Sequence, residues 1–127
     1  MKQEFDILFV GAGPASLAGA LHLRRFLNRN PRYRDLSVAV LEKGPGIGDH
    51  TLSGASLDVK AMAELFPEFE RKMGLLGPKV SGEGISFLTE KRRLPFPFVP
   101  PGMSNDGCYV ISLSEFVKWL ASECEKE

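Results

Sequence analysis

Residues 6–16 read DILFVGAGPAS, a short apolar run followed by a glycine-rich turn and the start of a helical pattern. The four consecutive β-formers from Ile7 to Val10 predict a strand covered on both faces, as in the centre of a parallel sheet. Gly11 allows a tight turn, and Gly13 has no Cβ to keep the backbone away from a phosphate. The stretch therefore predicts the strand, turn and helix start of a dinucleotide-binding unit.

The helix after this turn is expected to run from Pro14 to about Leu27. Proline suits the first turn, because its missing N–H would be unpaired there in any case. The unpaired N–H groups and partial positive charge of a helix N-terminus favour a phosphate. The apolar stripe expected to face the sheet consists of Ser16, Ala20, Leu23 and Leu27. This places Ser16, which occupies the third glycine position of the motif, where helix and strand approach most closely.

A second buried strand is predicted at 37–41, with Glu42 at its carboxyl end. A carboxylate at this position accepts hydrogen bonds from a ribose and disfavours a ribose 2′-phosphate. Glu42 follows Gly11 by 31 residues, rather than by about twenty, and a polar connection at 28–35 accounts for the excess. Strand, turn, helix, strand and terminal acid together predict a parallel βαβ unit for FAD or NAD rather than NADP.

Composition narrows the function further. The 127 residues suffice for one domain or part of one, but not for a nucleotide domain plus a complete substrate domain. Sixteen basic and sixteen acidic residues give no net charge, so we expect no nucleic-acid partner. Cys108 and Cys124 lack metal-ligand spacing, and no Ser/His/Asp set or paired carboxylates indicate independent chemistry. We therefore predict no metal site and no catalytic residue in this chain.

No targeting or membrane-spanning segment is expected either. The sequence has no run of about eighteen apolar residues, the length that a membrane-spanning helix needs. The first strand begins within a few residues of Met1, which leaves no space for a presequence. We expect either a bacterial gene or a chain from which a presequence has been removed.

The loop after Glu42 has four glycines in eleven residues, so its backbone can pass close to a ligand. Here the sequence resembles a known family, the electron transfer flavoprotein–ubiquinone oxidoreductases. The resemblance rests on E-K-x-x-x-I-G-x-H-T-L-S-G-A at 42–55 with L-D at 57–58, on L-T-E-K at 88–91 and on C-Y-V-I-S-L at 108–113. It covers nearly the whole chain, and T-L-S-G-A and L-T-E-K are more selective than the nucleotide turn.

The resemblance implies an α/β chain that forms part of a Rossmann-like FAD-binding fold of the glutathione-reductase type. This part would comprise the parallel βαβ core and a small β/helical insertion. In the family, FAD takes electrons from reduced electron transfer flavoprotein, a [4Fe-4S] cluster takes part, and ubiquinone is reduced at the membrane. The implied location is peripheral, on the matrix face of the mitochondrial inner membrane or the cytoplasmic face of the bacterial membrane. Because such enzymes need several hundred residues, we expect this chain to be the first part of one, with the cluster cysteines outside it.

Candidate cofactor-binding residues follow from the motif and the resemblance together. Gly11, Gly13 and the helix start would hold the pyrophosphate, and Glu42 would hold the adenosine ribose. The loop 51–55 matches a family segment that runs along the cofactor and the quinone side. The complete candidate set is Gly11, Gly13, Pro14, Ala15, Ser16, Glu42, Lys43, Gly48, Ser53, Gly54 and Ala55.

An apolar helical region is predicted at 57–79, with Asp58 as N-cap and Pro67 as a kink or restart. Its stripe consists of Met62, Leu65, Phe66, Phe69, Met73 and Leu76. Two interpretations remain open. The stripe is either core, or, as the resemblance implies, a membrane-surface contact through Met62, Leu65, Phe66 and Phe69.

The remaining chain is expected to contain short strands with a proline-rich crossover at 80–113 and a helix at 114–127. The pattern predicts a strand at 85–88, a basic hairpin tip at 91–93, two buried phenylalanines in the crossover, Phe96 and Phe98, and a strand at 109–113. Ser112 and Glu115 have capping-box spacing. The last helix would bury Leu113, Phe116, Val117, Leu120 and Cys124. Residues 1–56 would then form the nucleotide half with its cofactor loop.

Two other functions fit the same residues. An NAD(P)H-dependent flavin reductase or monooxygenase of the same fold would show a second glycine-rich turn downstream. A truncated, non-catalytic module would keep the fold without redox function, and would stay colourless and without a flavin spectrum after FAD is added.

Overall fold

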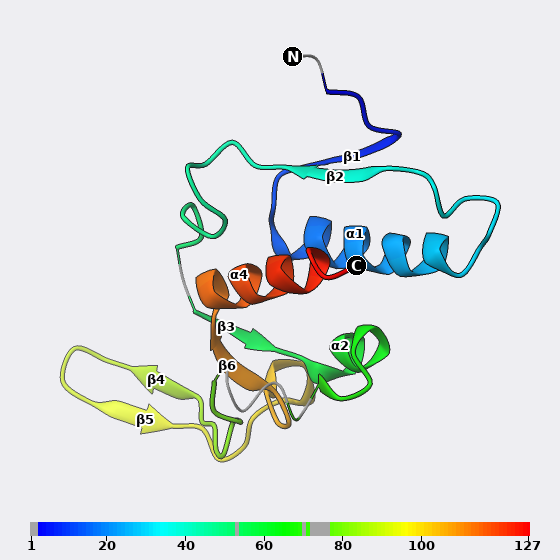
Figure 1. Ribbon diagram of the computed structural model, residues 1–127. Coiled ribbons are helices and arrows are strands. Elements are labelled where there is room, and N and C mark those ends of the chain that lie inside the picture. Colours follow the sequence, from blue (N-terminus) through cyan, green and yellow to red (C-terminus); the bar gives the residue numbers. More distant parts are fainter. Residues whose placement is uncertain (1–2, 53, 70, 72–76) are drawn as a thin grey trace. The chain divides into compact units, whose positions relative to one another are not determined.

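The computed structural model describes residues 3–52, 54–69, 71 and 77–127. The chain divides into two compact units, Met1–Ala55 with Ser112–Glu127, and Ser56–Ile111. In the first unit, β1 (Ile7–Val10) leads through α1 (Pro14–Asn28) to β2 (Val38–Leu41), and α4 (Leu113–Cys124) packs along α1 (Figure 1). β1 and β2 pair in parallel, with Ile7 opposite Val38 and Val10 opposite Leu41. The predicted parallel βαβ unit is therefore confirmed.

The two strands are joined where they begin. Asp6 accepts hydrogen bonds from the backbone N–H of Ser37 at 2.8 Å and from its hydroxyl at 2.7 Å. These bonds, the backbone one foremost, hold the pKa of Asp6 below its usual value. The pair therefore helps to fix the register that brings the other ends of the strands together.

β1 is covered on one face only. Phe9 lies toward α1, and its ring would be 3.2 Å from a Cβ placed on Gly19. Leu8 and Val10, on the other face, are exposed. The prediction of a strand covered on both faces is wrong for the chain as described, because one helical layer packs on the β1–β2 pair and its opposite face stays open.

α1 spans nearly the predicted residues but is rotated relative to the predicted stripe. Its buried side chains are Leu17, Ala20, Leu21 and Leu27. Ser16 and Leu23 are only half-buried. The rotation arises because α1 packs on α4 as well as on the strands, and the close approach to β1 falls at Gly19 rather than Ser16.

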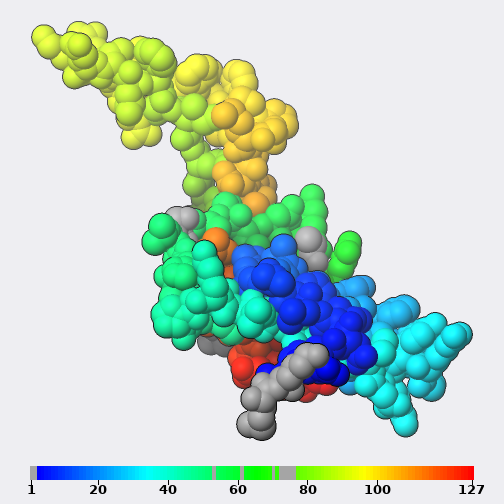
Figure 2. Space-filling view, turned by 90° about the horizontal axis from the view of Figure 1, so that it is seen from above, coloured from blue at the N-terminus to red at the C-terminus, as the bar shows by residue number. Residues whose placement is uncertain are grey.

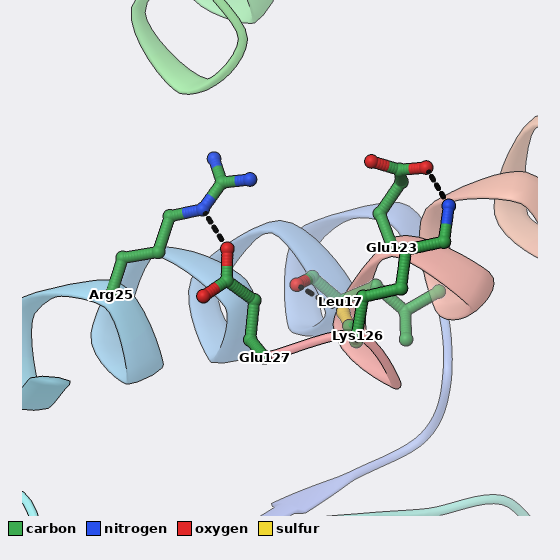
Figure 3. Close-up of polar contacts among 6 residues, drawn as sticks. Leu17, Arg25, Glu123, Lys126 and Glu127 are labelled. Atoms are coloured by element: carbon green, nitrogen blue, oxygen red, sulfur yellow. Dashed lines mark hydrogen bonds and ion pairs between the residues drawn. The ribbon is translucent and has the colours of Figure 1, made fainter.

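α4 begins where its capping residue predicts, but Leu113 and Cys124, two of the side chains predicted to be buried, are only half-buried. The hydroxyl of Ser112 accepts a hydrogen bond from the backbone N–H of Glu115 at 3.4 Å, which caps the helix. Its buried side chains include Phe116, Val117 and Leu120. At its end, the thiol of Cys124 lies 3.4 Å from the carbonyl oxygen of Leu17, and Arg25 pairs with Glu127 at 2.6 Å (Figure 3). Partial burial raises the pKa of the Cys124 thiol.

The second unit contains short elements. β3 (Gly54–Leu57) pairs with β6 (Tyr109–Ser112), and β4 (Ser86–Leu88) forms an antiparallel hairpin with β5 (Arg93–Pro95), whereas β3 and β6 each cross a boundary between the two units in the sequence. α2 (Val59–Leu65) begins at Asp58, whose carboxylate accepts from the N–H of Lys60 at 2.9 Å. α2 ends before Phe66, since the residue preceding a proline disfavours helical backbone. A 3₁₀ turn, η1 (Pro101–Met103), follows the hairpin.

The apolar stripe at α2 is core where it is described. Met62, Phe66 and Phe69 are 7%, 4% and 1% exposed. Leu65 is half-buried, and Met73 and Leu76 lie outside the described residues. Three of the four side chains considered for membrane contact are thus buried, which favours the core interpretation.

Two further expectations have definite outcomes. Phe96 and Phe98 are exposed rather than buried in a crossover, because they follow a two-stranded hairpin rather than a strand inside a larger sheet. Among the described residues, no helix has the length and apolar character needed to cross a membrane.

Candidate dinucleotide site

The turn between β1 and α1 leaves open space at its backbone. Gly11 has φ +93°, a conformation that favours glycine, and its N–H donates to the carbonyl of Leu41 at 2.7 Å. Gly13 is the N-cap of α1 and supplies no capping side chain, which leaves the first-turn N–H groups to a ligand or water. A Cβ on either glycine would meet nothing within 4 Å. An anion can therefore approach both the turn and the helix N-terminus.

Glu42 joins this turn to the loop that follows β2. Its Oε2 accepts from the N–H of Ala12 at 2.8 Å, and its Oε1 accepts from the N–H of Gly44 at 2.8 Å. The Ala12 bond, followed by the Gly44 bond, holds the pKa of Glu42 below its usual value. A carboxylate has about four acceptor positions, so the two bonds leave room for ribose hydroxyls.

The loop after Glu42 is held by the start of α4. Gly48 has φ +84°, and its carbonyl accepts a hydrogen bond from the hydroxyl of Ser114 at 3.1 Å. A Cβ on Gly48 would lie 2.9 Å from that hydroxyl oxygen. Within the loop, the N–H of Thr51 donates to the same carbonyl at 3.1 Å. Glycine is thus required here for both backbone conformation and space.

An open pocket of about 440 Å³ lies between the turn and this loop. Its volume is within the usual range for small-molecule sites. His50 is at its rim, with Nδ1 3.9 Å from Oε1 of Glu42. The lining comprises Val10, Gly11, Ala12, Gly13, Leu41, Glu42, Lys43, Gly46, Gly48, His50 and Thr51. The backbone of the glycine turn, the N-cap residue of α1 and the Glu42 carboxylate therefore line one space.

The structure brings together some of the candidate residues. Those that line the pocket are Gly11, Gly13, Glu42, Lys43 and Gly48. Pro14, Ala15 and Ser16 form the first turn of α1 outside the lining, and Gly54 and Ala55 belong to β3. Ser53 lies outside the described residues.

Six lining residues are absent from the candidate set, namely Val10, Ala12, Leu41, Gly46, His50 and Thr51. Ala12 contributes its backbone N–H, which carries no side-chain signal. His50 and Thr51 stand in the family-like motif, which could have drawn attention to them. Among the described residues, no group of three or more His, Cys, Asp or Glu could hold a metal ion.

The sequence comparisons are consistent with this geometry. Over 124 residues, 97% of this chain, it is 41% identical to the mitochondrial electron transfer flavoprotein-ubiquinone oxidoreductase of Sus scrofa. Over 126 residues it is 42% identical to the probable electron transfer flavoprotein-ubiquinone oxidoreductase of Acinetobacter baylyi. The chain is homologous to a segment of the electron transfer flavoprotein–ubiquinone oxidoreductases. The family resemblance of the sequence is confirmed.

This homologous segment spans 20% of the length of the Sus scrofa protein and 22% of that from Acinetobacter baylyi. Among solved structures, the chain resembles a geranylgeranyl bacteriochlorophyll reductase-like protein from Thermoplasma acidophilum, with a TM-score of 0.61 and 25% identity. That likeness covers 96% of this chain and 28% of the other. No protein-family model matches the chain.

Proposed function

We propose that this segment of an electron transfer flavoprotein–ubiquinone oxidoreductase homologue binds the adenosine diphosphate half of FAD. The observation that supports this most strongly is the Glu42 carboxylate, which joins two glycine-containing loops at the edge of an open pocket. Homology to an oxidoreductase family over nearly the whole chain supports a redox cofactor rather than an unrelated nucleotide. Glu42 disfavours a 2′-phosphate, which argues against NADP.

Each group has a part in holding the cofactor. Gly11 and Gly13 let the pyrophosphate approach the backbone, and the N-terminus of α1 offers donors and partial positive charge to it. Glu42 would accept hydrogen bonds from the ribose hydroxyls while keeping Ala12 and Gly44 in place. FAD supplies the redox chemistry when bound, and this chain's residues bind and orient it.

For the whole protein, we propose electron transfer from electron transfer flavoprotein to ubiquinone, as the names of its relatives describe for them. A [4Fe-4S] cluster would be held outside this segment. The whole protein would lie peripherally on the mitochondrial inner membrane or the bacterial cytoplasmic membrane, where its lipid-soluble acceptor is found. Ser53, Gly54 and Ala55 stay candidates for the cofactor and quinone side.

Replacing Glu42 tests the ribose assignment. We expect Glu42→Ala to weaken FAD binding by about tenfold or more, because hydrogen bonds to charged groups contribute about 1.5–3 kcal/mol. Asp35→Ala, which removes the same charge from an exposed position outside this pocket, should leave the affinity unchanged. The measurement is the Kd from quenching of flavin fluorescence. Equal affinity for the Glu42 variant and the unmodified chain would refute the ribose assignment.

A further inference from the structure

The β4–β5 hairpin separates its side chains into two faces. Directly opposite residues share a face, and the register pairs Phe87 with Leu94. The N–H of Phe96 donates to the carbonyl of Ile85 at 2.8 Å, which extends the same register. One face therefore carries Phe87, Leu94 and Phe96, here called the Phe87 face. The other face carries Ser86, Leu88, Arg93 and Pro95, with Arg93 donating to the hydroxyl of Ser86 at 2.8 Å.

The Phe87 face is exposed although its pattern is that of a buried face. Phe87, Leu94 and Phe96 are 61%, 50% and 53% exposed. In Figure 2 the hairpin, coloured yellow-green to yellow, extends away from the rest of its unit. Three large apolar side chains side by side on a two-stranded hairpin are unusual without a covering layer, since such hairpins are marginally stable alone.

The hydrogen-bond pattern also exposes one strand edge. The backbone N–H of Thr89 donates to the carbonyl of Arg92, and that of Phe96 donates to the carbonyl of Ile85. Because hydrogen-bonded and non-hydrogen-bonded pairs alternate along antiparallel strands, the N–H and C=O groups of Ser86 and Leu88 point away from β5. Along the outer edge of β5, Pro95 has no N–H to offer. β4 is therefore the edge at which another strand can pair.

We propose that the Phe87 face and the β4 edge form an interface for polypeptide, namely the further sequence by which the relatives exceed this segment. The relatives are about five times as long as the matched part, which covers 20% of the Sus scrofa protein and 22% of the Acinetobacter baylyi one. A polypeptide strand satisfies the outward backbone groups of β4, whereas lipid hydrocarbon leaves such groups without partners. Polypeptide therefore fits this surface better than a bilayer does, even with Lys91 and Arg92 in the connection between the strands.

The test compares this chain alone with a whole protein. In the second arm, the chain replaces the matching segment of the Acinetobacter baylyi relative, and amide hydrogen exchange of residues 86–94 is measured in both. We expect exchange at least about tenfold slower in the whole protein, because the added contacts should make local opening of the hairpin rarer. A tenfold smaller equilibrium constant for opening corresponds to about 1.4 kcal/mol of added stability. Phe87→Ser with Phe96→Ser should abolish the slowing, whereas Leu88→Ser on the opposite face should keep it.

A conservative double variant shows whether lost slowing of exchange comes from the lost apolar face or from misfolding. Phe87→Leu with Phe96→Leu keeps the face apolar and should retain most of the slowing. Equal exchange in the chain and the whole protein would overturn the proposal. Protection of the chain alone by vesicles of phosphatidylglycerol and phosphatidylcholine, without slowing in the whole protein, would overturn it in favour of lipid. Protection that rises with the concentration of the chain alone would overturn it in favour of a second copy.

Discussion

Glu42 connects the two backbone segments that line the proposed binding site. Its two oxygens accept from N–H groups on either side of the pocket, so the spacing of the turn and the loop depends on a single charged group. A neutral glutamine has one acceptor oxygen and an NH₂ group that only donates, and so cannot accept one bond at each end of the side chain as Glu42 does. The charge of Glu42 therefore contributes to the shape of the pocket, in addition to the ligand contact proposed for it.

The two glycines of the turn should respond differently to substitution. Gly11→Ala forces a side chain onto φ +93° and should lower the free energy of unfolding by about 1–3 kcal/mol. Gly13 has φ −79°, so Gly13→Ser should stay within about 0.5 kcal/mol, since serine is a good N-cap. Its side chain would nevertheless occupy the space in front of the turn and weaken FAD binding. Urea unfolding combined with FAD titration separates these effects.

Loss of stability from both glycine variants in equal measure would contradict this division of roles. So would unchanged FAD affinity of a stably folded Gly13→Ser protein, because the side chain would then not face the phosphate.

Stability should fall in acid because carboxylates accept hydrogen bonds in the folded state. Asp6, Glu42 and Glu83 have pKa values below their usual range, chiefly through bonds from Ser37, Ala12 and Ser104 respectively. At a pH below the usual pKa values of these carboxyl groups, the unfolded chain binds more protons than the folded chain. The stabilisation by these hydrogen bonds is therefore present above about pH 5 and is lost as the pH falls through the pKa values of the folded chain. Urea unfolding between pH 7 and pH 3 measures this. Asp6→Asn and Glu83→Gln should each reduce the slope, and unchanged slopes would contradict the assignment.

At the scale of elements, the sequence predicts the bounds of each helix or strand better than it predicts which other elements pack against it. β1, α1, β2 and the capped start of α4 lie within a residue or two of expectation, because apolar runs, proline and capping residues act locally. The buried face of α1 was misplaced because periodicity within one helix does not show that a second helix, α4, also packs on it. The prediction that Phe96 and Phe98 are buried is wrong for a similar reason, because the pattern within one segment does not show which other elements pack on it.

The stripe of α2 yields an element-scale test with a matched control. Phe69 is 1% exposed whereas Phe98 is exposed, and both lie in the second unit. We expect Phe69→Ala to lower the free energy of unfolding by about 3–5 kcal/mol through a core cavity, and Phe98→Ala to change it by about 0.5 kcal/mol or less. Circular dichroism during urea unfolding reports both. Equal effects of the two substitutions on the free energy of unfolding would contradict the core interpretation of the stripe. So would a folded Phe69→Ala protein that has lost binding to lipid vesicles, because the stripe would then be a membrane-surface contact.

For the whole molecule, the sequence predicts the parallel βαβ unit but not which elements pack around it. Glu42 was placed correctly beside the turn because a parallel βαβ unit brings the carboxyl ends of its strands together. The contributions of Ala12 and Gly46 to the pocket depend on backbone path, which side-chain identity does not encode. The exposed faces of the β1–β2 pair and of the hairpin likewise depend on which elements pack together, which the pattern of a single strand does not show.

The central claim is that this chain holds the adenosine diphosphate half of FAD. Calorimetric titration of the chain with FAD, ADP and FMN tests it most directly. We expect FAD and ADP to bind with Kd values within about threefold of each other, a difference of under 1 kcal/mol, and FMN to show no saturable binding in that range. FMN binding as tightly as FAD, together with no binding of ADP, would contradict the account.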